Sequence, residues 1–167
     1  NAATGVANLD INAAADVAAL DAANETITVN GSLGTSDVTY TAGDSAFAYA
    51  ANVNAVSGDT GVTASAKTTA TLTAGETGNI SLTLGTYTSG TTAVGTATVI
   101  TGTVNDTADL TELAKAINEK SAATLVTAEL SADLGTITLT QDQGYSIGLD
   151  NATDSDGVID ANILTVG

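Results

Sequence analysis

The sequence predicts an α+β protein, rich in β-strands, in which two tandem units each combine antiparallel strands with one amphipathic helix. Short segments of alternating polar and apolar residues recur along the chain and are separated by turn residues, which is typical of strands. A helical pattern occurs near the middle of each half, and the two halves repeat one another. Because strands come in runs and do not alternate regularly with helices, an α+β arrangement is favoured over βαβ units.

The clearest helix is predicted in the stretch 109–130. Its apolar residues fall at i, i+3, i+4 and i+7, the spacing of one helical face: Leu110, Leu113, Ala114 and Ile117. Asp106 or Asp109 is expected to cap its start, since a short carboxylate accepts backbone N–H bonds there. The period then drops to two in the segment 125–130, which predicts that the helix is followed by a strand.

This stretch occurs twice, sixty-four positions apart. The apolar face of the second helix aligns with four residues of the first half: Ala46, Tyr49, Ala50 and Val53. Asn54 aligns with Asn118, Ser57 aligns with Ser121, and the segment 62–64 aligns with 126–128 without a gap. A repeat that keeps the helix face, the helix end and the next strand in register indicates a structural unit.

Three segments follow from these patterns: an N-terminal connecting segment (1–23) with a helix over 9–23, a first unit (24–89), and a second unit (90–167) with an acidic C-terminal loop. A first-unit helix is expected over 44–56, and Asn30–Gly31 predicts a hairpin turn. Strands are expected at 27–29, 37–41, 62–66, 69–73, 80–84, 96–104, 124–130, 136–140, 145–149 and 163–166. Residues 93–101 are expected to be paired on both sides or buried, because an uncharged edge invites aggregation. Whether the two units share a sheet is left open.

Composition limits the partners and the core. The net charge of −16 repels phosphate backbones and anionic lipids, so neither nucleic acid nor a membrane surface is an expected partner. Aromatic residues make up 3% of the chain, so Val, Ile, Leu and Ala must fill the core. No apolar run approaches the roughly 20 residues that span a bilayer, no basic-then-apolar leader opens the chain, and the absence of Cys excludes disulfides.

Neither catalysis nor metal binding is predicted, so no catalytic, cofactor or metal residue is proposed. The chain has no His or Cys to act as base or nucleophile, and no phosphate-binding glycine motif, although a carboxylate pair of the glycosidase kind is not excluded. The loop from Asp150 to Asp160 resembles a calcium loop when Gly157 is aligned with its glycine. Ala152 and Ile163 then fall at the two end-ligand positions, so a solvated turn is the preferred interpretation.

Five N-x-S/T triplets occur, starting at Asn24, Asn30, Asn79, Asn105 and Asn151. A chain this rich in Thr and Ser produces such triplets by chance, so none is singled out as a glycosylation site.

In the second unit the order of motifs is TATVITG, DLTELAKAINEKS, LVTAELS, LGTITLTQDQG and YSIGLD, with Ile117–Asn118 near the end of the helix. In the first unit Val53–Asn54 takes that place, between ETITVNG and GVTASA. Both units resemble the flagellin IN repeat, a motif of the variable central part of bacterial flagellins and of some hook-associated proteins.

The resemblance implies a structural role without a cofactor. The chain would be the outward-facing central region of a flagellin, extracellular on the filament, whose partners are other flagellin subunits bound through segments absent from this chain. O-linked glycans on exposed Ser and Thr are also compatible with it. Two alternatives remain: a domain of a hook-associated or filament-cap protein, and a Ca²⁺-dependent adhesin or surface-layer module.

Overall fold

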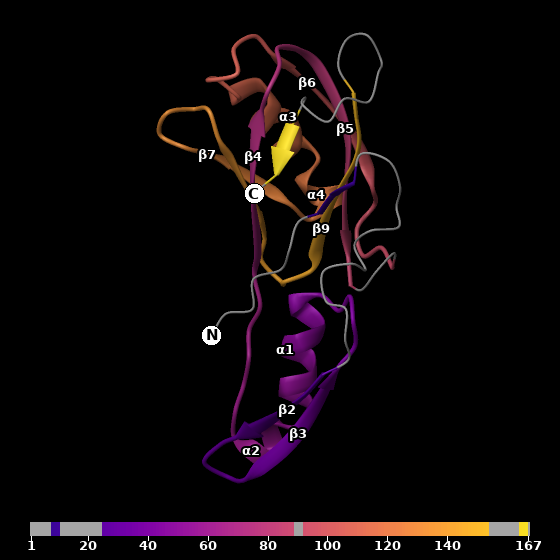
Figure 1. The fold of residues 1–167 in the computed structure, drawn as a ribbon, viewed down its shortest axis with the longest axis vertical. Coiled ribbons are helices and arrows are strands. Elements are labelled where there is room, and N and C mark those ends of the chain that lie inside the picture. Colours follow the sequence, from indigo (N-terminus) through magenta and orange to yellow (C-terminus); the bar gives the residue numbers. More distant parts are fainter. Residues whose placement is uncertain (1–7, 11–24, 89–91, 154–163, 167) are drawn as a thin grey trace.

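The computed structural model describes residues 8–10, 25–88, 92–153 and 164–166. The molecule is elongated, with a small group of elements at one end and a larger two-sheet assembly at the other (Figure 1). Its strands are mostly antiparallel, and its helices are short. The predicted α+β class, rich in strands, is therefore confirmed.

The smaller part consists of a β-hairpin and two helices. Its elements are β2 (Glu25–Asn30), β3 (Thr35–Tyr40), α1 (Ala46–Ala55) and α2 (Ser57–Thr60). The hairpin turns where Asn30–Gly31 predicts it, and the Gly31 N–H donates to the carbonyl of Gly34 at 2.9 Å. Tyr40 of β3 stacks on Tyr49 of α1 with ring centroids 4.0 Å apart, so aromatic contact joins the helix to the hairpin.

The larger part contains two four-stranded sheets. One has the order β1 (Asn8–Asp10), β9 (Ser146–Thr153), β5 (Gly78–Tyr87), β6 (Thr98–Val104). The other has the order β10 (Leu164–Val166), β4 (Thr68–Ala74), β8 (Ile137–Gln141), β7 (Thr127–Leu130). Helix α3 (Thr111–Glu119) packs against β6 and β7, one strand of each sheet, and is followed by α4 (Ser121–Thr124).

The core lies between these sheets and α3, and it is aliphatic, as the composition predicts. Its members come from both sheets and from the helix: Ala70, Leu72, Ile80, Leu82, Leu84, Ile100, Val104, Leu110, Leu113, Ala114, Ile117, Val126, Ile137, Leu139, Ile147, Leu149, Ala152 and Leu164. Gly102 of β6 allows α3 to approach closely, because a Cβ there would lie 2.9 Å from Cδ1 of Leu113. No described residue of the smaller part belongs to this cluster.

The two predicted units share both of these sheets. Strands β4 and β5 precede the proposed boundary at residue 89, yet β4 pairs with β8, and β5 pairs with β6 and β9. The segments 46–64 and 110–128, called here the first and the second repeat, therefore belong to parts of very different size. The domain limits at residues 23 and 89 stay a prediction.

Two predicted elements differ from the structure. Leu9 and Asp10, expected at the start of a helix over 9–23, lie in β1, where pairing with Leu149 and Asp150 of β9 overrides the local helical pattern. The rest of that predicted helix lies outside the described residues. Residues 62–66, expected to form a strand, are assigned to no sheet, because no described strand lies beside them to complete a ladder.

The expectation that residues 93–101 are paired on both sides or buried is wrong. Strand β6 begins at Thr98 and lies at the end of the described sheet, where β5 is its neighbour. The side chain of Val99 is 60% exposed. Helix α3 packs against this strand, and no strand of the described part pairs with its outer edge.

Removing the buried hydroxyl of Thr68 is expected to stabilise the protein. Thr68, at the start of β4, is fully buried, and its Oγ1 has no hydrogen-bond partner among the described residues. Because valine has the same shape without the unpaired polar atom, Thr68→Val should raise the free energy of unfolding by about 1–2 kcal/mol. Urea denaturation followed by circular dichroism measures this change. A loss of stability would show that the hydroxyl has a partner, such as a buried water.

Candidate functional site

The most distinctive local structure is a pair of hydrogen bonds made by one asparagine at the end of α3. The Asn118 amide donates from Nδ2 to the carbonyl of Ala128 at 2.8 Å, and its Oδ1 accepts the Ala128 N–H at 2.8 Å. A primary amide offers one donor side and one acceptor, as a peptide group does, so it replaces a strand partner. We call this arrangement the asparagine clamp. It fixes β7 to the end of the helix that precedes it.

The same clamp occurs in the first repeat. Asn54 donates to the carbonyl of Ala64 at 2.9 Å and accepts the Ala64 N–H at 2.8 Å. Both residues lie sixty-four positions before their counterparts. The sequence alignment of Asn54 with Asn118 therefore identifies two side chains that make the same bonds.

The turn that follows α1 is repeated after α3. Ser57 and Ser121 each donate a hydroxyl to the carbonyl of the clamp asparagine, at 2.7 and 2.8 Å. Three residues further on, Thr60 and Thr124 donate to the carbonyls of Val56 and Lys120, at 2.9 and 3.1 Å. Each threonine Oγ1 also accepts the N–H of the residue two positions later. The sixty-four-residue offset predicts the pairing of the two serines, and the same offset relates the two buried threonines, which were not predicted.

The two repeats bury their helices to different extents. Leu113 and Ile117 of α3 are completely buried. Their counterparts in α1, Tyr49 and Val53, are only half-buried. Both Tyr49 and Leu113 face the preceding strand, where Tyr49 meets Tyr40 and Leu113 meets the backbone of β6. The two repeats therefore share the contact between the helix and the preceding strand. They differ in burial, because the apolar face of α3 is fully covered and that of α1 is only partly covered.

The start of α3 differs slightly from the prediction. Leu110 occupies the N-cap position, and Asp109 acts one residue earlier by accepting the Thr111 hydroxyl at 2.6 Å and the Thr111 N–H at 3.1 Å. These bonds favour the charged carboxylate and hold the pKa of Asp109 below its usual value. Asp106 instead accepts the N–H of Ala108 in the turn before the helix. These carboxylates order the turn before the helix.

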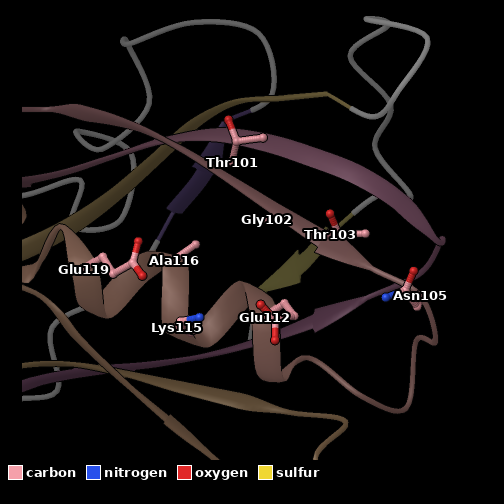
Figure 2. A pocket seen from close by; sticks show the side chains of 8 residues that line it. All are labelled: Thr101, Gly102, Thr103, Asn105, Glu112, Lys115, Ala116 and Glu119. Atoms are coloured by element: carbon pink, nitrogen blue, oxygen red, sulfur yellow. The ribbon is translucent and has the colours of Figure 1, made fainter.

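A groove of about 500 Å³ lies between β6 and α3 (Figure 2). Glu112, Lys115 and Glu119 lie along the helix side, and Thr101 and Thr103 come from the strand (Figure 2). This lining contains two carboxylates, one ammonium group and hydroxyls. It contains neither imidazole nor thiol.

A second groove, of about 530 Å³, lies beside α1 and is mostly apolar. Its lining includes Phe47, Ala50 and Ala66. The ring of Phe47 also contacts Tyr145 at a centroid distance of 4.4 Å, so one wall connects the smaller part to the turn before β9.

No metal-binding cluster of three or more His, Cys, Asp or Glu side chains occurs within the described ranges. Of the acidic loop from Asp150 to Asp160, the structure describes the residues up to Thr153, which belong to β9. The remaining loop residues lie outside the described part. None of the helices that the structure describes is long and apolar enough to cross a bilayer.

The repeated clamps define a structural repeat, in which the same pair of hydrogen bonds holds the segment after each helix to the end of that helix. Residues 26–86 match the family model of the flagellin hook IN motif. The chain thus contains a flagellin-type IN-motif region, and this motif family is structural. No curated protein matches the sequence.

The matched range closely follows the first predicted unit (24–89) and includes the clamp of Asn54. The second clamp, at Asn118, lies outside it and is connected to the motif by the internal repeat. The family match and the repeated hydrogen-bond pattern therefore coincide in the first repeat.

The asparagine clamp carries a direct prediction. Asn118→Asp keeps an acceptor but loses the N–H donor, and the new charge lies near the carbonyl of Ala128. We expect the free energy of unfolding to fall by about 1–2 kcal/mol. Asn118→Gln, which moves the same amide outward, should cost a similar amount. Denaturation curves as stable as that of the unsubstituted protein would show that β7 needs no clamp.

The residue after α4 carries another prediction. Leu125 has φ = 60° and is 39% exposed, whereas its repeat counterpart Gly61 has φ = 73°. Left-handed backbone costs a non-glycine residue about 1–2 kcal/mol. Glycine loses about 0.5–1 kcal/mol through chain entropy, so Leu125→Gly should stabilise the protein by about 0.5 kcal/mol.

The reciprocal change tests the same explanation. Gly61→Ala introduces the left-handed penalty, and its Cβ would lie 3.0 Å from Oγ of Ser32 and 3.1 Å from Cγ of Leu33. It should lower the melting temperature while Leu125→Gly raises it. Shifts of the same sign in both variants would contradict the account.

Proposed function

We propose that this chain is the outward-facing central region of a flagellin, built from two IN-type units. The observation that carries the proposal is the asparagine clamp of Asn54 inside the matched motif, repeated at Asn118. The match of residues 26–86 to the flagellin hook IN motif supports an origin among flagellin-related and hook-associated proteins. The role is structural, and no substrate or cofactor is part of it.

In this role the module gives the filament its surface. The net charge of −16 and the abundance of threonine produce an acidic, hydroxyl-rich coat that repels neighbouring surfaces at low ionic strength. Assembly with other flagellin subunits takes place through segments outside this chain. Exposed hydroxyls offer acceptors for O-linked glycans. The expected location is extracellular, on the flagellar filament.

A second candidate is a domain of a hook-associated or filament-cap protein. The specific observation in its favour is the family itself, whose description names the hook. The two candidates share the fold and the clamps and differ in where the subunit is placed along the flagellum.

Immunogold electron microscopy distinguishes them. Antibodies raised against this chain are applied to intact flagellated cells of the source organism, and antibodies against an unrelated cytoplasmic protein serve as the control. Labelling along the whole filament is the expected result. Labelling confined to the hook junction or the filament tip would support the hook-associated or cap protein instead. Labelling of the cell envelope without the flagellum would overturn both and favour the adhesin.

A further inference from the structure

The free edge of β6 is the feature that the proposed function leaves unexplained. The strand has seven residues and pairs with β5 at every position from Thr98 to Val104, without a bulge. On its other side no strand of the described part is present. The stretch from Thr77 to Asn105, which includes all of β5 and β6, contains no charged residue in a chain of net charge −16.

The other described sheet edges are short, occupied or charged. Strands β1 and β10 have three residues each. The outer side of β7 is occupied by the Asn118 clamp, and β7 also carries Glu129. In the small hairpin, β3 carries the exposed Asp37, which is the repeat counterpart of Thr101 in β6. Charges and bound side chains are common means by which proteins prevent pairing at an edge, and no residue of β6 is charged.

The sequence of β6 suits pairing with a copy of itself. In an antiparallel arrangement centred on Thr101, Val99 faces Thr103 of the second copy, and Ile100 faces Gly102. Partners in these pairs share a face of the sheet, because each pair has the same parity. Val99 and Thr103 are β-branched residues, which form favourable cross-strand pairs. No pair in this register brings two charges together.

We propose that β6 is a pairing surface for a second copy of this chain, which adds its own β6 antiparallel across a two-fold axis at Thr101. Pairing joins the sheet β1-β9-β5-β6 of one copy to the same sheet of the second copy. The two then form one continuous sheet, and the β6 edge is no longer open in either copy. This proposal stands on the strand itself and does not depend on the flagellar assignment.

The groove beside β6 determines how the pairing responds to salt. Pairing brings the α3 helices of the two copies close together, and each groove contributes Glu112, Lys115 and Glu119, one net negative charge (Figure 2). Together with the overall charge of −16, these groups oppose association at low ionic strength. Salt screens this repulsion, so pairing becomes tighter as the salt concentration rises. An interface held by opposite charges would instead weaken as the salt concentration rises.

Symmetry then limits where such a contact can occur. A two-fold contact is isologous, and subunits in a polar filament all point the same way, so neighbours within one filament cannot form it. If the chain has the proposed function, β6 pairing connects subunits of adjacent filaments.

Sedimentation of the purified chain tests the pairing. Analytical ultracentrifugation should show a monomer–dimer equilibrium that tightens between 50 and 500 mM NaCl, concentrations chosen to span about 14 to 4 Å of screening length. Thr101→Asp places two like charges opposite each other and should weaken the dimer about tenfold or more. Thr127→Asp adds the same charge to an exposed threonine of β7 and should leave the dimer unchanged. A monomer under all conditions, or a dimer unaffected by Thr101→Asp with its thermal melt preserved, would overturn the proposal.

Cysteine substitution tests the register. The chain has no cysteine, so each introduced thiol is unique. Directly opposed residues of an antiparallel pair lie about 4.5–5.5 Å apart, within disulfide range. Thr101→Cys should therefore form a linked dimer when diamide accepts the two electrons and two protons. Val99→Cys should form far less linked dimer, because in this register residue 99 lies opposite Thr103 of the second copy and not opposite the same thiol. Equal linking of the two variants, or of Thr127→Cys, would contradict a two-fold axis at Thr101.

Discussion

Gly31→Ala is expected to destabilise the smaller part of the molecule strongly. A Cβ at Gly31 would lie 1.9 Å from the carbonyl oxygen of Thr60 and 2.7 Å from its carbon, so the hairpin and the end of α2 must separate. That movement also disrupts the bond in which the Leu33 N–H donates to the Thr60 carbonyl at 3.2 Å. We expect the free energy of unfolding to fall by about 3 kcal/mol. Near-ultraviolet circular dichroism of the Tyr40–Tyr49 stack reports this unfolding in urea.

Gly58→Ala is the matched control. Gly58 lies two residues before Thr60, is exposed, and has no atom within 4 Å of its added Cβ. The free energy of unfolding of the Gly58→Ala variant should be unchanged or higher by at most about 1 kcal/mol, because alanine favours a helix. Gly95→Ala, at the repeat counterpart of Gly31, should act in the same direction as Gly31→Ala, since its Cβ would lie 2.7 Å from the Ala123 carbonyl oxygen. Equal stabilities of Gly31→Ala and Gly58→Ala would show that the hairpin and α2 do not pack as described.

Ile117→Ala should lower the free energy of unfolding by about 3–4 kcal/mol. Ile117 is completely buried in the core between α3 and the two sheets, so its loss leaves a cavity that a packed interior cannot close. Urea denaturation at fixed pH measures the change in the free energy of unfolding. A steeper or shallower dependence on urea would show a change in the compactness of the unfolded state.

Val53→Ala provides the comparison within the same chain. Val53 is the repeat counterpart of Ile117 but is only half-buried, so we expect a cost of about 1 kcal/mol. The single extra methylene of isoleucine accounts for about 0.8 kcal/mol of the difference, and the rest comes from the cavity. Similar losses in both variants would mean that α1 is covered as completely as α3.

The sequence predicted local features well. Residues at helical spacing on α3, such as Leu113 and Ile117, are the ones that the core buries. The sixty-four-residue offset paired Asn54 with Asn118, and both asparagines make the same bonds. These features succeed because they depend on neighbours within about ten residues, where periodicity and turn chemistry act directly.

Features that depend on distant segments were harder to predict. Residues 62–66 and 126–130 alternate alike, yet only the latter have β8 beside them to complete a ladder. Asp10 belongs to β1 because β9, far along the chain, offers an edge. The groove beside α3 was not predicted either, since it arises from how the helix sits over β6 and leaves no pattern in the sequence.

The path of the chain through the two sheets determines which piece of this protein is exchangeable. Cutting at residue 89 would remove β4 and β5 and so take interior strands away from the large assembly. The hairpin, α1 and α2 form a compact insert between Glu25 and Thr60 that contributes nothing to the main hydrophobic cluster. Laboratory grafting that replaces this insert alone keeps every strand of the two four-stranded sheets and loses the contact of Phe47 with Tyr145. This tip is therefore the piece of the described chain that can be exchanged without removing a strand from the body that carries it.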